Sequence, residues 1–105
     1  MAEFGTVTGQ DGASALAVSG DLDISGVDEF LAHVGELLTT GSGPFVLDLG
    51  GVTFIDSSGL GALVRVQKSA SSVGRDLRLE HVPRSVSRIL ELTGLTDLFP
   101  ERHES

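Results

Sequence analysis

The chain of 105 residues contains no cysteine, which excludes disulfide bonds and thiolate-bound metal sites. The same absence favours a cytoplasmic protein slightly, because disulfides mark oxidising compartments. No run approaches the roughly 18 apolar residues that a membrane-spanning helix needs. The N-terminus also lacks the basic-then-apolar pattern of a signal peptide. We therefore expect a cytoplasmic protein that does not associate with a membrane.

Positive charge is scarce as well. The chain has 7 basic residues against 15 acidic ones, a formal net charge of −8, and Lys68 is its single lysine. Binding to nucleic acid or to an anionic membrane needs clustered Lys and Arg, so neither is expected as a direct partner. The acidic surface would attract a basic protein partner, although surplus acid also simply keeps a small domain soluble.

The N-terminal half alternates strand and helix patterns. Residues 4–8 and 14–19 read as two strands of a hairpin, with turn chemistry at 9–12. Residues 20–23 are then expected to carry the chain out of the sheet. Ser25 suits the N-cap of a first helix that stops at 39–44. Its expected core face is Ile24, Val27, Leu31, Val34 and Leu38, joined by Phe30 and Leu37.

The C-terminal half repeats the alternation. Residues 45–49 form a buried strand, the turn 56–59 opens a helix that ends near 72–74, and residues 77–82 form another strand. Residues 84–93 give a third helix, which Gly94 closes. Leu95, Leu98 and Phe99 are apolar enough to pack back on the core, and residues 99–105 are otherwise expected to be a frayed tail.

These elements predict one α/β domain over residues 1–105. Strand–helix–strand units at about 14–49 and 45–82 should be right-handed parallel crossovers. With the N-terminal hairpin they give a mixed sheet of four or five strands, covered by three or four helices.

The turn Asp56-Ser57-Ser58-Gly59 is the expected functional site. A helix N-terminus offers unpaired N–H groups and partial positive charge, so it would tolerate a phosphate of about −1.5 to −2 charges on Ser57. Small neighbours allow another protein to approach closely. The plainer interpretation is that Asp56 or Ser57 only caps the helix. Leu60 is either an exposed apolar anchor or part of the core.

Catalysis has weak support. The turn lacks the first glycine of a Gly-x-Ser-x-Gly motif, and His33, His81 and His103 lie on the polar side of a helix, in a strand and in the tail. Nucleotide-binding loops and metal-ligand spacings are also missing. A cation site and a solvated acidic rim both remain open for three carboxylates, Asp21, Asp23 and Asp56.

Several motifs occur in an order that resembles one family. Phe54–Gly61 (FIDSSGLG) is similar to the signature of STAS-domain anti-sigma factor antagonists. Gly20–Asp23 resembles that family's Gly-Glu-Leu-Asp, with Asp21 where Glu is usual. Residues 46–49 precede the turn at the usual separation, and 86–99 look like the family's C-terminal helix and tail. The resemblance covers nearly the whole chain.

The resemblance implies a bacterial regulator of transcription that is not an enzyme. Its unmodified form would bind an anti-sigma factor that is also a serine kinase, and would thereby release the sigma factor. Phosphorylation of Ser57, with Ser58 as the fallback acceptor, would end binding, and a metal-dependent serine phosphatase of the PP2C type would restore it. ATP and Mg²⁺ belong to the kinase, so no cofactor or metal is expected here. The implied contacts are Asp21, Asp23, Asp56, Ser57, Ser58, Gly59, Leu60, Ser85 and Val86. The alternative is a STAS-like interaction module in another signalling or transport assembly, without a phosphoswitch.

Overall fold

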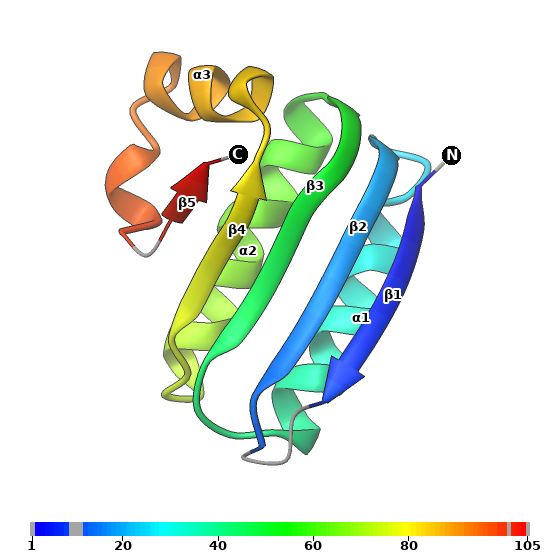
Figure 1. Cartoon of the computed structure of the whole chain (residues 1–105), viewed down its shortest axis with the longest axis vertical. Coiled ribbons are helices and arrows are strands. Elements are labelled where there is room, and N and C mark those ends of the chain that lie inside the picture. The colour runs from blue at the N-terminus through cyan, green and yellow to red at the C-terminus, as the bar shows by residue number, and fades with distance from the viewer. Residues whose placement is uncertain (1, 9–11, 101, 105) are drawn as a thin grey trace.

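A computed structural model describes residues 2–8, 12–100 and 102–104 as one five-stranded sheet with helices on it (Figure 1). The strands lie in the order β1-β2-β3-β4-β5. The elements along the chain are β1 (Glu3–Thr8), β2 (Ser14–Leu22), α1 (Val27–Thr40), β3 (Phe45–Ile55), α2 (Ser57–Ser72), β4 (Leu77–Val82), α3 (Arg84–Leu92), a 3-10 turn (Thr96–Leu98) and β5 (Arg102–Glu104).

Strand pairing matches the expected α/β arrangement. β1 and β2 are antiparallel, which confirms the hairpin, and β2–β3, β3–β4 and β4–β5 are parallel. Most of the predicted hairpin turn, residues 9–11, lies outside the described residues. Figure 1 shows α1 and α2 side by side on one face of the sheet, and α3 at the end of β4. The carboxyl ends of β2, β3 and β4 therefore meet at one end of the domain.

The core lies between the sheet and the two long helices. Alternate residues of β2 and β3 point into it, and Phe30, Phe45 and Phe99 are its largest buried side chains. Phe4 of β1 adds a stacked contact, with its ring centroid 5.9 Å from that of Phe30. Burying this much apolar surface is the main source of the fold's stability.

The structure corrects the expected start of the first helix. β2 continues through Asp21 to Leu22 instead of leaving the sheet at Gly20, and α1 begins only at Val27. The residue at its N-cap is Gly26, which makes no side-chain cap hydrogen bond, so the prediction of a Ser25 cap was wrong. Ile24, expected in the core, is 77% exposed. A turn of four residues lies between strand and helix, and Ile24 belongs to it.

The frayed tail was also predicted wrongly. Phe99 is buried, and Arg102–Glu104 pair with β4 as a parallel edge strand. Backbone pairing of a short segment adds little by itself. Packing of Leu95, Leu98 and Phe99 on the core anchors the chain beside β4 before β5 begins.

A buried arginine ties the other end of the domain together. The Arg75 side chain is only 6% exposed. Its guanidinium donates to the backbone carbonyls of Leu37 (2.7 Å), Gly43 (3.0 Å) and Pro44 (3.1 Å), and to Ser14 Oγ (3.2 Å). One side chain thus joins the last turns of α1 to the loop before β3, and a planar five-donor fork is suited to such a set of acceptors.

Candidate partner-binding surface

The β3–α2 turn is built around the Asp56 carboxylate. Asp56 has extended backbone, and its Oδ1 accepts a hydrogen bond of 2.9 Å from the Gly59 N–H. The Leu60 N–H donates to the Asp56 carbonyl at 2.9 Å. Asp56 is therefore the N-cap of α2, as the plainer interpretation allowed, and it satisfies donors that a helix start leaves unpaired.

Because Asp56 is the cap, Ser57 has no capping role. Ser57 is the first helical residue, its side chain is exposed, and its hydroxyl makes no hydrogen bond within the described part of the chain. Ser58 is half-buried. The hydroxyl of Ser57 therefore faces solvent at the positive end of a helix of 16 residues.

Gly59 brings this turn against the end of β2. A Cβ placed on Gly59 would overlap the Leu22 carbonyl oxygen and lie 2.8 Å from Ile55 Cγ1. Only glycine allows the two backbones to approach so closely. The contact sets the Asp56 turn directly beside the turn that follows Leu22.

That second turn holds Asp23. Asp23 Oδ1 accepts hydrogen bonds from the Ser25 hydroxyl (2.6 Å) and the Ser25 N–H (3.1 Å), and the Gly26 N–H donates to the Asp23 carbonyl (3.0 Å). The hydrogen bond from the Ser25 hydroxyl is the main reason that the pKa of Asp23 lies below its ordinary value. Asp23 is therefore a fixed negative charge at neutral pH.

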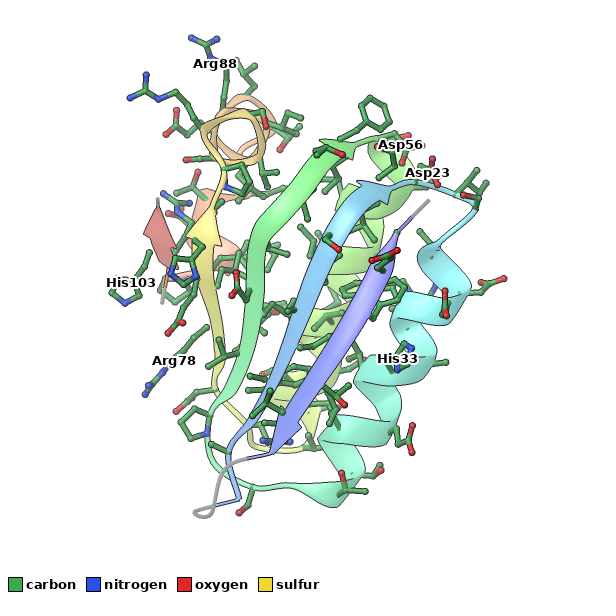
Figure 2. All side chains as sticks on the ribbon, turned by 45° about the vertical axis from the view of Figure 1, so that its right-hand side comes forward. Asp23, His33, Asp56, Arg78, Arg88 and His103 are labelled. Atoms are coloured by element: carbon green, nitrogen blue, oxygen red, sulfur yellow. The ribbon has the colours of Figure 1, made fainter. Side chains whose placement is uncertain are left out.

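Asp21 completes a row of carboxylates that come from different elements. Its Oδ1 accepts from the Thr53 hydroxyl at 3.1 Å, across the β2–β3 pairing. Figure 2 shows Asp23 and Asp56 close together at the carboxyl ends of the strands. Within the described residues, no three acidic, His or Cys side chains gather closely enough to hold a metal ion. The three carboxylates are half-buried and lie along the rim at this end of the domain.

Two other predicted contacts lie on α3, away from this row. β3 and β4 pair only from Phe45–Leu77 to Asp48–Glu80. Beyond Asp48 and Glu80 the two strands separate, and this separation keeps α3 away from the carboxylates. There, Asp48 Oδ1 accepts from the Gly50 N–H (2.9 Å) and lies 3.2 Å from His81 Nδ1, and His81 has a left-handed φ of 54°. β3 then continues to Ile55 beside β2, while β4 ends at Val82, just before α3.

The predicted contacts differ in exposure. Ser57 and Ser85 are exposed, Asp21, Asp23 and Asp56 are half-buried, and Gly59 is buried. Leu60 is half-buried and packs against the core. Val86 is 1% exposed, so its side chain serves the core and cannot reach a partner in this structure. That assignment is corrected.

Sequence reasoning missed two exposed apolar side chains at this end of the domain. Ile24 is 77% exposed, and Phe54, which pairs with Asp21, is 52% exposed. Their positions in the sequence were the one available signal. Ile24 directly follows the predicted site residue Asp23, and Phe54 lies two residues before Asp56. Simple strand alternation could not reveal Phe54, since irregular register makes both Thr53 and Phe54 exposed.

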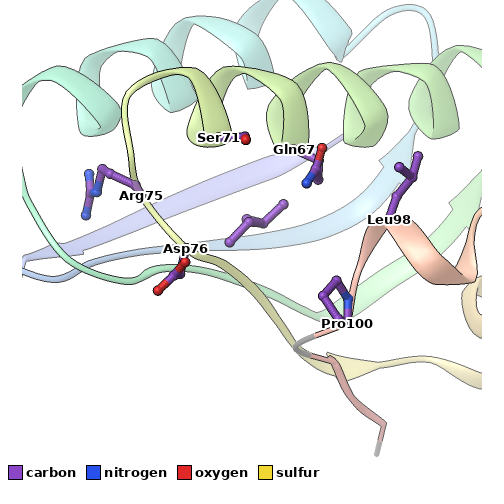
Figure 3. Close-up of a pocket in the computed structure, with 7 residues that line it drawn as sticks. Gln67, Ser71, Arg75, Asp76, Leu98 and Pro100 are labelled. Atoms are coloured by element: carbon purple, nitrogen blue, oxygen red, sulfur yellow. The ribbon is translucent and has the colours of Figure 1, made fainter.

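Two of the three histidines and one surface hollow lie away from the Asp56 turn. Figure 2 shows His33 and His103 well apart from Asp56, on α1 and at β5. A hollow of about 140 Å³ between α2 and the C-terminal segment is lined by Gln67, Ser71, Arg75, Asp76, Leu77, Leu98 and Pro100 (Figure 3). It lies toward the other end of α2, and its Arg75 is engaged with backbone carbonyls. No helix in the described ranges is both long and apolar enough to cross a bilayer.

Comparison with known proteins decides the family. The sequence profile described as "Mlab, STAS domain" matches residues 6–100. The chain belongs to the STAS domain family. This confirms the resemblance read from the Phe54–Gly61 segment and the three other motifs.

Named relatives of this STAS domain include sigma regulators. The anti-sigma-B factor antagonist of Staphylococcus aureus strain NCTC 8325 is 31% identical over 91 residues, which cover 87% of this chain and 84% of that protein. The crystal structure of a candidate anti-sigma factor antagonist from Thermotoga maritima superposes with a TM-score of 0.84 at 29% identity, covering 97% of this chain and 86% of that one.

The Bacillus protein SpoIIAA shares the fold in two states. Its unphosphorylated form superposes with a TM-score of 0.79 at 18% identity, covering 98% of this chain and 88% of that one. Its phosphorylated form gives 0.77 at 16% identity, with coverage of 98% and 91%. At these identities the likeness concerns the fold alone. The expected mixed sheet with three helices is confirmed.

Proposed function

We propose that this STAS domain is an anti-sigma factor antagonist that Ser57 phosphorylation switches off. In its unmodified state it binds an anti-sigma factor with serine kinase activity, and the sigma factor is released. The observation that carries the proposal is the exposed Ser57 hydroxyl, left uncommitted because Asp56 caps α2. The names of its relatives support the same class of partner.

The chemical step belongs to the kinase. Ser57 Oγ attacks the γ-phosphorus of ATP, an Oγ–P bond forms, the bond to the bridging oxygen of ADP breaks, and the hydroxyl proton is lost to a base of the kinase. Mg²⁺ and ATP come with the kinase. Hydrolysis of the phosphoserine by a metal-dependent serine phosphatase of the PP2C type would return the hydroxyl. This domain supplies no catalytic group of its own.

A phosphate on Ser57 is compatible with the fold. The side chain points to solvent from the first residue of α2, where the helix end favours negative charge. The carboxylates of Asp23 and Asp56 are nearby, so the phosphate adds to a surface that is already acidic. Phosphorylation therefore changes what a partner meets at the surface and leaves the core as it was. Dependence on ATP also puts the proposed cycle in the cytoplasm.

The test is intact mass spectrometry after incubation with ATP, Mg²⁺ and an anti-sigma serine kinase from the same organism. We expect one added phosphate on the wild type, none on Ser57→Ala, and one on Ser58→Ala. Modification retained in Ser57→Ala but lost in Ser58→Ala would move the switch to Ser58. Binding of the kinase without any modification would favour the alternative, an interaction module without a phosphoswitch.

A further inference from the structure

Two apolar side chains at the proposed docking end are left out of the core. Ile24 is 77% exposed in the turn after β2, and Phe54 is 52% exposed near the end of β3. Both are close to the switch, because Phe54 pairs with Asp21 and precedes Ile55 and Asp56, while Ile24 follows Asp23. Large apolar side chains exposed beside a functional site often mark an interaction surface.

The local backbone keeps Ile24 in this outward position. Ile24 lies between Asp23 and Ser25, whose side chains and backbone are joined by hydrogen bonds of 2.6 and 3.1 Å. The Gly26 N–H also donates to the Asp23 carbonyl at 3.0 Å, which closes the turn before α1 begins. The backbone that carries Ile24 is therefore held in place before any partner arrives, which lowers the entropy lost on binding.

Phe54 is held outward for a different reason. The β2–β3 register shifts between Gly20 and Asp21, so Thr53 and Phe54 are both exposed while Ile55 is buried. The Thr53 hydroxyl donates to Asp21 Oδ1 at 3.1 Å and fixes the neighbouring strand. A ring on a paired strand is a rigid anchor with two rotatable bonds.

The charge around these side chains selects the kind of partner. Asp21, Asp23 and Asp56 lie at the same end, whereas Arg88 of α3 points away from Asp23 and Asp56 (Figure 2). The chain carries a net charge of −8. A complementary face would have apolar sockets surrounded by Lys or Arg, with the charged pairs around the apolar centre.

We propose that Ile24 and Phe54 are the apolar anchors by which this domain docks onto a basic face of the kinase that modifies Ser57. This inference rests on the proposed function and deepens it. Apolar anchors provide most of the affinity in such interfaces, and the surrounding carboxylates provide orientation. Phosphorylation leaves both anchors in place, so release comes from the cost of burying a bulky dianionic phosphate in the interface and not from loss of the anchors.

The test is calorimetric titration of the kinase with Ile24→Ala, Phe54→Ala and the double variant. Val73→Ala and Leu92→Ala are the control variants. Val73 is 54% exposed, much like Phe54, but it lies at the far end of α2, about 24 Å along the helix axis from Ser57. We expect each anchor variant to bind at least tenfold more weakly, and the controls to bind within about twofold of the wild type. Thermal unfolding of all five proteins should be nearly unchanged, because every altered side chain is exposed.

Phosphorylation kinetics give a second readout. At low protein concentration the anchor variants should be modified at least tenfold more slowly, and at saturating concentration the rate should return to the wild-type value, because the anchors act in docking only. Anchor variants that bind and react like the wild type would overturn this inference while the phosphoswitch stands. A wild type that the kinase neither binds nor modifies would overturn the proposed function as well.

Sedimentation of the domain alone tests whether Ile24 and Phe54 instead bind a second copy of this chain. We expect the wild type and Phe54→Ala to sediment alike as monomers. Self-association of the wild type that Phe54→Ala abolishes would assign the anchors to a second copy of this chain, and would overturn the kinase as their partner.

Discussion

The backbone of Gly59 lies directly against the Leu22 carbonyl, so the first turn of α2 packs onto the end of β2 with no room for a side chain. This contact places the hydroxyl-bearing turn beside the turn of Asp23. Two segments more than thirty residues apart in sequence thus form one surface. The glycine of the Asp-Ser-Ser-Gly turn is required by this packing, whatever the partner is.

Gly59→Ala should destabilise the domain by about 2–4 kcal/mol, because its Cβ would meet backbone atoms that cannot move aside. Gly61→Ala is the matched control two residues along the same helix. A Cβ there meets nothing within 4 Å, so it should stabilise by about 0.5–1 kcal/mol. Urea unfolding measures both. Equal stabilities of the two variants would show that the Leu22 contact is not restrictive.

Ser57→Asp should fold normally and bind the kinase at least tenfold more weakly. An acidic residue in the first turn of α2 is favourable by about 0.3–1 kcal/mol, so the free energy of unfolding should not fall. Binding should weaken because burying a carboxylate in an interface that has no prepared partner for it costs several kcal/mol, and about 1.4 kcal/mol is a factor of ten in affinity.

Ser69→Asp is the control for charge alone, because it adds the same charge at an exposed position nearer the other end of α2. Calorimetric titration should give this variant an affinity close to that of the wild type. Equal affinities of wild type and Ser57→Asp would count against Ser57 as the switch.

Ser25→Ala should raise the pKa of Asp23 toward its ordinary value, since the hydroxyl hydrogen bond of 2.6 Å is the main cause of its lowering. A carboxyl with a lowered folded-state pKa adds stability above its ordinary pKa, and that stability is lost as the pH falls through the folded-state value. Ser25→Ala therefore loses this stability at neutral pH, and the two proteins converge as the pH falls below the folded-state pKa of Asp23, which stays ionised at neutral pH in both. Carboxyl-carbon NMR titration measures the shift, with Ser85→Ala as a control that should leave Asp23 unchanged.

Arg75→Ala should destabilise the domain by about 3 kcal/mol, because it leaves buried carbonyls of the α1 end and the following loop without donors. Arg75→Lys should recover only part of this loss, since one ammonium group cannot reach acceptors that a planar fork serves. Exposed Arg65→Ala should stay within about 0.5 kcal/mol of the wild type. Denaturant midpoints of the three variants provide the comparison, and an unchanged Arg75→Ala would contradict a structural role.

The sequence by itself determined the local elements of this protein. Alternating and helical spacings of apolar residues predicted β1 to β4 and the three helices, and an acid before Ser57 predicted a capped helix start at that point. Such signals are local: they depend on residues within a few positions of one another. The family resemblance also rested on short segments, and the site around Ser57 came from one of them.

Tertiary structure alone decided what these segments meet. The approach of Gly59 to Leu22, the carbonyl cluster around Arg75, the pairing of β5 with β4 and the register shift that exposes Phe54 all depend on residues far apart in the chain. Hydrophobic periodicity reports which residues prefer burial, but strand register and turn length decide which of them are actually buried. For that reason the sequence assigned Ile24 to the core, and the folded chain leaves it on the surface beside the switch.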